Sequence, residues 1–354
     1  MKKTLLSILL FSVGLSVHSQ LAVSNTETPQ ELILNTFMGQ NTSISNVKFN
    51  GTLANAQMLR DQVGRYSNGS AGLGSSDGLI LCTGKAIVAT GPNNQAGASN
   101  VTSLPVSGDP DLALITTTTV RNVCIVEFDF VPNFDSVLFE YIFASEEYPT
   151  YVNTSFNDVF GLFLSGPGIT GPFSNNAINI ASIPGTSLPV SINNLNNGTT
   201  NNGPCEYCQY YVNNTGGTQY QFNARSTDFT AFSTVTSGQT YHVKFAIANV
   251  GDNALESAIF LTAGSFRSAM LGNENFTTEK IKIYPNPATD FIHISSADSI
   301  SEITIYDIQG RSLLNTKTNG TDIELNTQDL STGTYIVEFV LDTTEKITQK
   351  LVIR

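Results

Sequence analysis

Two short polar segments place carboxylate and amide side chains directly beside strand-like runs. Glu146 and Glu147 follow the apolar run 136–143, and Asn157 and Asp158 adjoin the run 158–164. Calcium in proteins is held by about six to eight oxygens from carboxylates, amides and backbone carbonyls, often supplied by neighbouring loops. The two segments therefore predict a Ca²⁺ site.

A third acidic segment, 252–256, follows the run 240–248 and joins this site if that strand lies beside the other two. The predicted calcium ligands are Glu146, Glu147, Asn157, Asp158, Asp252 and Glu256, with Asn253 close by. A structural alternative stays open. In it, Glu146 caps backbone amides at a sharp turn and Asp158 fixes an Asx-turn.

Cys205 and Cys208 are separated by two residues, a spacing that fits a redox pair, half of a zinc site or a loop staple. A redox pair needs a helix N-terminus after the first cysteine, whereas the flanks are rich in Asn, Gly and Tyr. A zinc site needs two further cysteines nearby, but Cys82 and Cys124 lie inside strand-like runs. We therefore predict a structural disulfide.

Four tyrosines surround these cysteines in an Asn- and Gly-rich loop: Tyr207, Tyr210, Tyr211 and Tyr220. Tyrosines on a rigid loop offer stacking surface at a low entropic cost. We therefore expect a ligand-binding loop that fits a sugar. The chain has no Trp, and the alternative is that these tyrosines are half-buried spacers between strands.

Catalytic chemistry has weaker support in the sequence. His242 and His293 both lie within strand-like runs that are typical of structural positions, and a nucleophilic triad needs a histidine poised over a Ser or Cys. Adjacent Glu146 and Glu147 point to opposite faces of an extended chain, so they do not form a glycosidase pair. Carboxylates from distant loops remain an alternative, which makes an enzyme disfavoured rather than excluded.

Short strands joined by turns must position these residues, because Val, Ile and Phe alternate with polar residues between Gly, Pro, Asn and Ser. We predict an all-β fold whose large domain is a two-sheet, jelly-roll-like sandwich. Thr28, Pro29 and Glu31 form a capping box that starts one short helix, and 53–63 predicts a second. The predicted strands are 79–82, 123–130, 136–143, 158–164, 177–183, 240–248 and 257–263.

A smaller β domain follows a polar linker, 270–280, that is poor in apolar residues. Seven short runs in 281–354 predict a small immunoglobulin-like sandwich. Its predicted strands are 281–284, 291–295, 303–307, 312–315, 322–325, 333–341 and 346–353.

The N-terminal residues indicate export. Lys2 and Lys3 precede an apolar run that ends in a small-residue stretch, which predicts a signal peptide over 1–19 and a large domain over 20–269. No other apolar run has the length of a transmembrane helix. The net charge of -12 repels polyanions, so we expect no nucleic acid partner.

The C-terminal residues carry several motifs in a fixed order: YPNPATD at 284–290, IYDIQGR at 305–311, LSTGTYIV at 330–337 and KLVIR at 350–354. Together they resemble the type A sorting domain of the Bacteroidetes type IX secretion system. The resemblance implies the type IX machinery as a partner, export to the outer surface, removal of this domain, and release or surface attachment. The matching residues are Tyr284, Pro285, Asn286, Pro287, Asp290, Gly310, Arg311, Gly333, Tyr335 and Lys350.

The large domain carries two further motifs, FEYIFASEEYP at 139–149 and FNDVFGLFLSGPG at 156–168. With SDGLIL at 76–81, IPGT at 183–186 and GQTYHVK at 238–244, they resemble the choice-of-anchor L domain. That family implies a surface location rather than a reaction. We therefore expect a secreted or cell-surface, non-enzymatic binding or adhesion module that binds glycan or another surface component, with Ca²⁺ support. The alternatives are a secreted hydrolase and a structural surface-layer adhesin without a small ligand.

Overall fold

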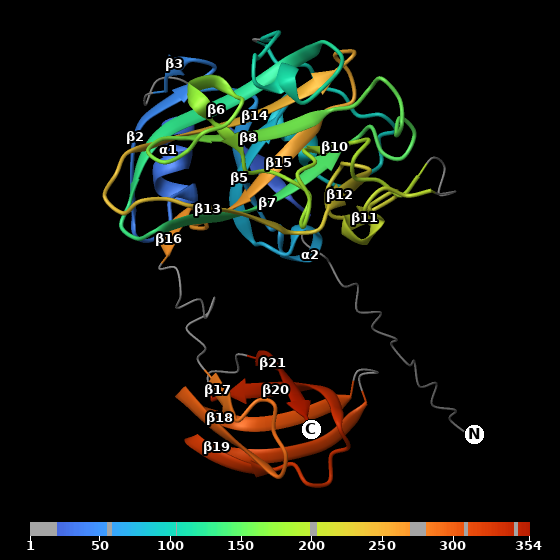
Figure 1. The fold of residues 1–354 in the computed structure, drawn as a ribbon. Coiled ribbons are helices and arrows are strands. Elements are labelled where there is room, and N and C mark those ends of the chain that lie inside the picture. Colours follow the sequence, from blue (N-terminus) through green and yellow to red (C-terminus); the bar gives the residue numbers. More distant parts are fainter. Residues whose placement is uncertain are drawn as a thin grey trace, which may run out of the picture. The chain divides into compact units, whose positions relative to one another are not determined.

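The computed structural model describes residues 20–54, 59–103, 105–198, 204–269, 281–307, 311–342 and 346–354. They fall into two compact units, one before and one after residue 272. The predicted signal peptide 1–19, the predicted linker 270–280 and Gly310 lie outside the described residues. Both units are built from antiparallel sheets, so the all-β prediction is confirmed (Figure 1).

The described residues of the large unit form two sheets that face each other. Sheet A has the order β1-β4-β5-β15-β7-β12-β11, with β13 and β16 also paired to β7. Its strands are β1 (Ala22–Ser24), β4 (Val63–Ser67), β5 (Asp77–Cys82), β7 (Ser136–Ser145), β11 (Tyr211–Asn213), β12 (Ala224–Ser226), β13 (Phe229–Thr234), β15 (Ser257–Thr262) and β16 (Arg267–Ala269).

Sheet B, the second sheet of the large unit, has the order β10-β8-β14-β6-β2-β3, with β9 paired to β8. Its strands are β2 (Thr42–Phe49), β3 (Thr52–Leu53), β6 (Val120–Pro132), β8 (Val159–Ser165), β9 (Ile178–Asn179), β10 (Val190–Ser191) and β14 (Tyr241–Val250). The strand predicted at 177–183 is present only as the short β9, and the other six predicted strands are confirmed.

An aromatic core joins the two sheets. Phe139 of β7 and Phe245 of β14 lie 5.3 Å apart between ring centroids, and Phe37 contacts both rings. Each fully buried Phe side chain contributes roughly 1.5–3 kcal/mol of transfer free energy. Alternation along β7 and β14 sends these residues inward, while apolar residues on the outer faces pack in two further clusters, around Phe260 on sheet A and Phe163 on sheet B.

The capping box at the start of the chain forms as predicted. Thr28 Oγ1 accepts from Glu31 N at 3.2 Å, and Glu31 Oε2 accepts from Thr28 N at 2.8 Å. The helix α1 (Pro29–Glu31) continues as a π-helix over Leu32–Phe37, which carries Phe37 into the core. The other helical segments are α2 (Ser70–Leu73) and 3₁₀ turns at Ala86–Ala89, Leu112–Leu114, Ser174–Asn176 and Cys208–Tyr210.

The second predicted helix, 53–63, is wrong wherever the structure describes it. Leu53 ends β3, residues 59–62 form coil and turn, and β4 begins at Val63. Val63 pairs with Leu81 in sheet A. The mixed spacing of apolar residues here therefore reflects the approach to a strand rather than one face of a helix.

The small unit contains five strands among its described residues, not the seven predicted. Register shifts between Ser295 and Ile300 keep one long strand, 291–307, going where two were expected. A second long strand, 312–326, likewise replaces the two expected at 312–315 and 322–325. The two halves of the first long strand pair with different neighbours, 281–284 and 333–341. Gaps in the apolar pattern therefore mark bulges within long strands. The strands are β17 (Ile281–Tyr284), β18 (Phe291–Asp307), β19 (Ser312–Asn326), β20 (Gly333–Leu341) and β21 (Lys346–Ile353).

Candidate functional site

Four carboxylates lie at one end of the large sandwich, where strands of both sheets end or begin. Glu146 and Glu147 follow β7, Asp158 precedes β8, and Glu256 precedes β15. Each of these side chains is at most 2% exposed. We call them the buried carboxylate group. Their positions follow from strand pairing, because β15 pairs with β7 and brings Ser257 opposite Ser145.

Hydroxyl and backbone groups connect the members of this group. Ser257 Oγ donates to Asp158 Oδ2 at 2.6 Å and lies 2.8 Å from Ser145 Oγ. Ser145 Oγ in turn accepts from Glu147 N at 3.0 Å. The backbone N–H of Glu146 donates to the carbonyl of Glu256 at 3.1 Å. The end of the sandwich is therefore one connected polar region.

Glu256 is the best satisfied of the four carboxylates. It accepts from Thr83 Oγ1 at 3.1 Å, Ser99 Oγ at 3.0 Å and Asn100 N at 2.8 Å. Gly84 makes room for this side chain, since a Cβ there would lie 2.4 Å from the Glu256 carboxyl carbon. Glu256 therefore serves to tie the loop around Asn100 to the start of β15.

The remaining three carboxylates have progressively fewer donors. Asp158 accepts from Val250 N at 2.9 Å as well as from Ser257. Glu146 accepts from Gln221 Nε2 at 2.9 Å on one oxygen, while its Oε2 has no partner. Both oxygens of Glu147 are buried without a hydrogen-bond donor. Such a carboxylate is costly to ionise.

Burial shifts all four groups toward their neutral form. It raises the pKa of Glu146 to about 7, although the Gln221 hydrogen bond opposes this. Burial, with repulsion from Asp158 and Asp252, raises the pKa of Glu147 to about 9. Burial also raises the pKa of Glu256, and it raises that of Asp158 well above its usual range.

The six predicted calcium ligands do not form one ligand shell. Asn157 Oδ1 accepts from Asn193 N at 2.8 Å, and Asp252 Oδ1 accepts from Ala254 N at 3.0 Å. Across the described ranges, no three His, Cys, Asp or Glu side chains form a group that could hold a metal ion. Asn157 and Asp252 are thus engaged by backbone donors rather than gathered with the other predicted ligands.

The turn-capping alternative is also wrong in detail. Ser145, rather than Glu146, accepts the backbone N–H at the turn after β7. Asp158 bonds to Val250 on another strand rather than closing an Asx-turn in its own loop. These carboxylates therefore link distant segments of the chain.

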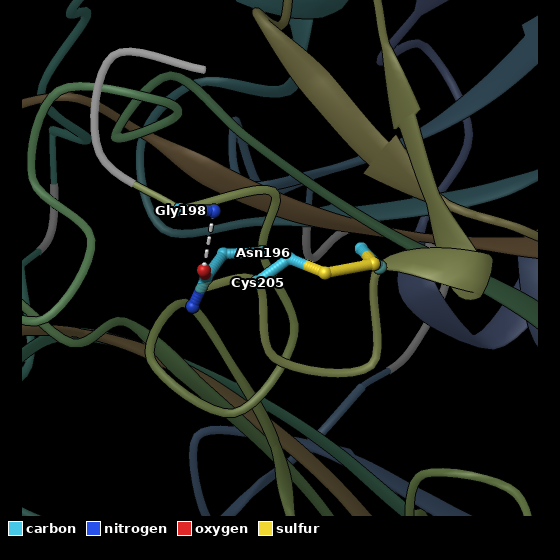
Figure 2. Close-up of a disulfide and its surroundings, with 4 residues drawn as sticks. Asn196, Gly198 and Cys205 are labelled. Atoms are coloured by element: carbon cyan, nitrogen blue, oxygen red, sulfur yellow. Dashed lines mark hydrogen bonds between the residues drawn. A yellow bond between two sulfur atoms is a disulfide. The ribbon is translucent and has the colours of Figure 1, made fainter. Parts of the chain in front are cut away.

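The disulfide between Cys205 and Cys208 is confirmed, with a Cα–Cα distance of 5.4 Å. Figure 2 shows the bridge beside Asn196, whose Oδ1 accepts from Gly198 N at 2.8 Å. Asn196 also exchanges backbone hydrogen bonds with Glu206, at 2.9 and 3.2 Å. The stapled loop is thereby attached to the segment that follows β10.

The tyrosines of this loop do not form one exposed surface. Tyr220 is only 2% exposed and packs in a different apolar cluster from the other three. Tyr211 packs on Tyr148, with ring centroids 5.2 Å apart, and Tyr210 packs on Phe229 at 5.4 Å. Tyr207 is half-buried against the same core. Tyr220 is therefore removed from the predicted ligand-binding set.

A charged network on the outer face of sheet B was not predicted from the sequence. His242 Nδ1 lies 2.7 Å from Asp129 Oδ1, and its Nε2 lies 3.2 Å from Glu127 Oε2. Lys244 Nζ lies 2.9 Å from Asp109 and also bonds to Asp111. Alternation along β6 places Glu127 and Asp129 on one face, and alternation along β14 places His242 and Lys244 on one face. That these two faces are the same follows only from the pairing of β6 with β14.

These partners shift the charged groups in the opposite sense to the buried carboxylate group. Hydrogen bonds that Glu127 and Asp129 accept from the His242 ring raise the pKa of His242. The bond to His242 lowers the pKa of Glu127. Although burial opposes it, bonds from Lys244 and Ser174 lower the pKa of Asp111. Both ring nitrogens of His242 face carboxylates, so it has no nucleophile to activate.

A pocket of about 300 Å³ opens on the outer face of sheet A, and we call it the outer acidic pocket. Asp77, Glu140 and Asp228 supply its carboxylates. Arg65 forms two hydrogen bonds to Asp77, at 2.9 and 2.5 Å. The other lining residues are Gly74, Ser75, Ser76, Tyr141, Ile142, Thr262 and Ala263.

The predicted sorting residues that the structure describes lie at turns and within strands of the small unit. Tyr335 Oη donates to Ser331 O at 2.6 Å, and Asn286 Oδ1 accepts from Val352 N at 3.0 Å. Arg311 Nε donates to Asp307 at 2.7 Å. The backbone of Lys350, in β21, pairs with that of Ile336, in β20. The C-terminal strand is thus held to the start of the unit.

Comparison with known proteins assigns both units. Residues 20–267 match the choice-of-anchor L domain. The chain belongs to this family. Residues 282–354 match the secretion system C-terminal sorting domain. This member of the choice-of-anchor L family is therefore exported by the type IX secretion system, interacts with that machinery, and is secreted or located at the outer surface.

Other similarities cover smaller parts of the choice-of-anchor L chain or of the compared proteins. Beta-agarase D of Zobellia galactanivorans is 37% identical over 76 residues, which are 22% of this chain and 15% of that protein. PorZ, a type IX surface component of Porphyromonas gingivalis, is 16% identical over 30% of this chain and 15% of its own, with a TM-score of 0.19. Latent PorU of the same organism is 11% identical over 82% of this chain and 24% of its own, with a TM-score of 0.18. Among the described helices, none is long and apolar enough to cross a membrane.

Proposed function

We propose that the large domain is a non-enzymatic surface binding module that recognises a neutral glycan in the outer acidic pocket. The observation that carries the proposal is the set of three carboxylates, Asp77, Glu140 and Asp228, around one open pocket. Exported surface proteins meet glycans, and pockets with a few fixed polar groups suit small ligands.

Arginines outside the lining hold the carboxylates in place. Arg65 bonds to Asp77 in two places, Arg225 lies 3.6 Å from Asp228, and Arg267 lies 3.7 Å from Glu140. A carboxylate held in this way accepts hydrogen bonds from sugar hydroxyls without losing much side-chain entropy.

The charge of the pocket limits the type of glycan. No Lys or Arg is among the residues that line it, and the whole chain carries a formal net charge of -12. An acidic sugar would be repelled by the overall field. Neutral hydroxyl-rich sugars match the carboxylates and the hydroxyls of Ser75, Ser76 and Thr262.

A glycan array probed with the full chain tests this proposal. We expect binding to neutral glycans, with affinity at least about tenfold weaker for Glu140→Gln or Asp228→Asn, because a charged hydrogen bond contributes about 1.5–3 kcal/mol. Glu324→Gln is the matched control, since Glu324 is 67% exposed on the small unit.

Three outcomes would overturn the proposal. Equal binding by the pocket variants would place the ligand elsewhere, and Tyr207→Ala then tests the stapled loop. Release of reducing sugar from a bound glycan would favour the hydrolase, with the pocket carboxylates as its acid and base. An array without any bound neutral glycan would favour a structural surface protein.

A further inference from the structure

Three buried side chains at the end of the sandwich have acceptor oxygens without donors, and Glu146 has one such oxygen, Oε2. The Glu147 carboxylate lacks a donor on both oxygens, and its side chain is 1% exposed. Asn249 is fully buried, and its Oδ1 also has no donor. Its Nδ2 donates to Ala254 O at 3.2 Å, which fixes the orientation of the amide. Buried acceptors normally have a partner.

Asp158 is hydrogen-bonded to the segments that carry Glu147 and Asn249. Its Oδ1 accepts from the backbone N–H of Val250, the residue after Asn249. Ser257 Oγ donates to Asp158 Oδ2 and lies 2.8 Å from Ser145 Oγ, which accepts from the backbone N–H of Glu147. The unpartnered oxygens therefore belong to one polar region rather than to separate defects.

The charges around this region are of one sign. Asp158 and Asp252 are close enough to repel the Glu147 carboxylate. Of the salt bridges that involve described residues, none includes Glu146, Glu147, Asp158 or Glu256. A buried carboxylate without a positive partner is strongly disfavoured. A bound cation supplies that partner.

We propose that Glu147, Asp158 and Asn249 bind one Ca²⁺ ion at this end of the sandwich. Calcium accepts carboxylate, amide and backbone oxygens in irregular arrangements, so the site does not need a third acid. Mg²⁺ fits poorly, because it demands near-octahedral geometry. The site keeps Glu147 and Asp158 of the set expected from the sequence and adds Asn249, whose Oδ1 has no donor. Asn157, Asp252 and Glu256 are left out because they accept from other donors, and Glu146 is left out because one of its oxygens accepts from Gln221.

The ion ties segments that are distant in the sequence. Glu147 follows β7 of sheet A, whereas Asp158 and Asn249 belong to the β8 and β14 side of sheet B. Calcium binding therefore closes one end of the sandwich by linking the two sheets. The site is separate from the outer acidic pocket, so its test does not depend on glycan binding.

Thermal melts of the full chain after EDTA treatment and dialysis test the site. We expect millimolar CaCl₂ to raise the Tm of the wild type by about 5 °C or more, because a ligand selective for the native state stabilises it. We expect Glu147→Gln to lose this shift, while Glu140→Gln, in the outer acidic pocket, keeps it. Asn249→Ala should need a higher CaCl₂ concentration for the same shift.

The proposal fails if the wild type shows no calcium shift, or if Glu147→Gln keeps the full shift. An equal shift with MgCl₂ would also overturn the assignment to calcium. If Glu147→Gln does not fold, Asn249→Ala decides the question, and an unchanged calcium response in that variant contradicts the site. If the wild type shows the calcium-dependent rise in Tm but binds no glycan, the result would count against the glycan proposal alone.

Discussion

The large domain holds two sets of carboxylates whose surroundings differ in one respect. On the outer face of sheet B, Asp109, Asp111, Glu127 and Asp129 each lie beside Lys244 or His242. At the end of the sandwich, the buried carboxylate group has only hydroxyl, amide and backbone donors. Each carboxylate of the first set has a cationic side chain of the protein beside it. The second set is suited to a cation from outside.

The largest expected effect comes from removing the internal cation. Lys244→Met leaves Asp109 and Asp111 buried and unpaired, at 6% and 2% exposure. We expect a loss of about 3–5 kcal/mol in the free energy of unfolding, measured by denaturant melts. Lys48→Met is the control, because the Lys48 side chain is half-exposed and its Nζ lies 3.8 Å from Glu127 Oε1, which makes a loose ion pair. For this variant we expect a loss of about 1 kcal/mol or less in the free energy of unfolding. Equal losses in Lys244→Met and Lys48→Met would show that burial does not make the Lys244 ion pairs stronger than the Lys48 pair.

Removing a buried carboxylate with neutral donors should have the next largest effect. Asp158→Ala leaves Val250 N and Ser257 Oγ without their acceptor. In EDTA we expect a loss of about 2–4 kcal/mol in the free energy of unfolding. Asp77→Ala, on the surface, should cost about 1 kcal/mol or less. A near-neutral Asp158→Ala would mean that the group is not held by these bonds.

The pH dependence of the outer network separates it further from the buried group. Since the folded-state pKa of His242 is raised, its bonds to Glu127 and Asp129 stabilise the fold below the ordinary histidine pKa. This contribution is lost as the pH rises through the folded-state pKa. In urea melts, we expect the free energy of unfolding of the wild type to exceed that of His242→Gln by up to about 1 kcal/mol at pH 6 and by less at pH 9. A difference that grows with pH would contradict the pairing.

The smallest expected effect on stability comes from Arg65→Ala. Arg65 is 44% exposed at its side chain, so its pair with Asp77 contributes about 1 kcal/mol or less to stability. Its role in holding Asp77 should appear instead as weaker glycan binding on the array. A large drop in Tm without a change in glycan binding would show that Arg65 stabilises the fold and does not position Asp77 for binding.

Much of the fold was predictable because local patterns decide it. The alternation in 136–143 and in 240–248 predicted β7 and β14, and the capping box of Thr28 and Glu31 forms as expected. Bulges were not predictable from spacing, which is why β18 was split into two strands. The order of motifs at 284–354 was sufficient for the sorting domain.

The candidate sites were less predictable, because they depend on strand order. Glu147 and Asp158 were found from their residue types, but Asn249 ends an apolar strand and gave no indication of a polar site. Lys244 meets Asp109 across 135 residues of sequence. The predicted ligands Asn157 and Glu256 accept from donors 36 and 156 residues away, which no spacing rule identifies.

Calorimetric titration of CaCl₂ into the EDTA-treated full chain tests the central distinction most directly. The account predicts one class of calcium site in the wild type, and at least about tenfold weaker binding for Glu147→Gln, the equivalent of about 1.4 kcal/mol. Glu127→Gln, a matched change in the set that lies beside Lys244 and His242, should bind calcium like the wild type. Equal calcium affinity in wild type and Glu147→Gln would contradict the account.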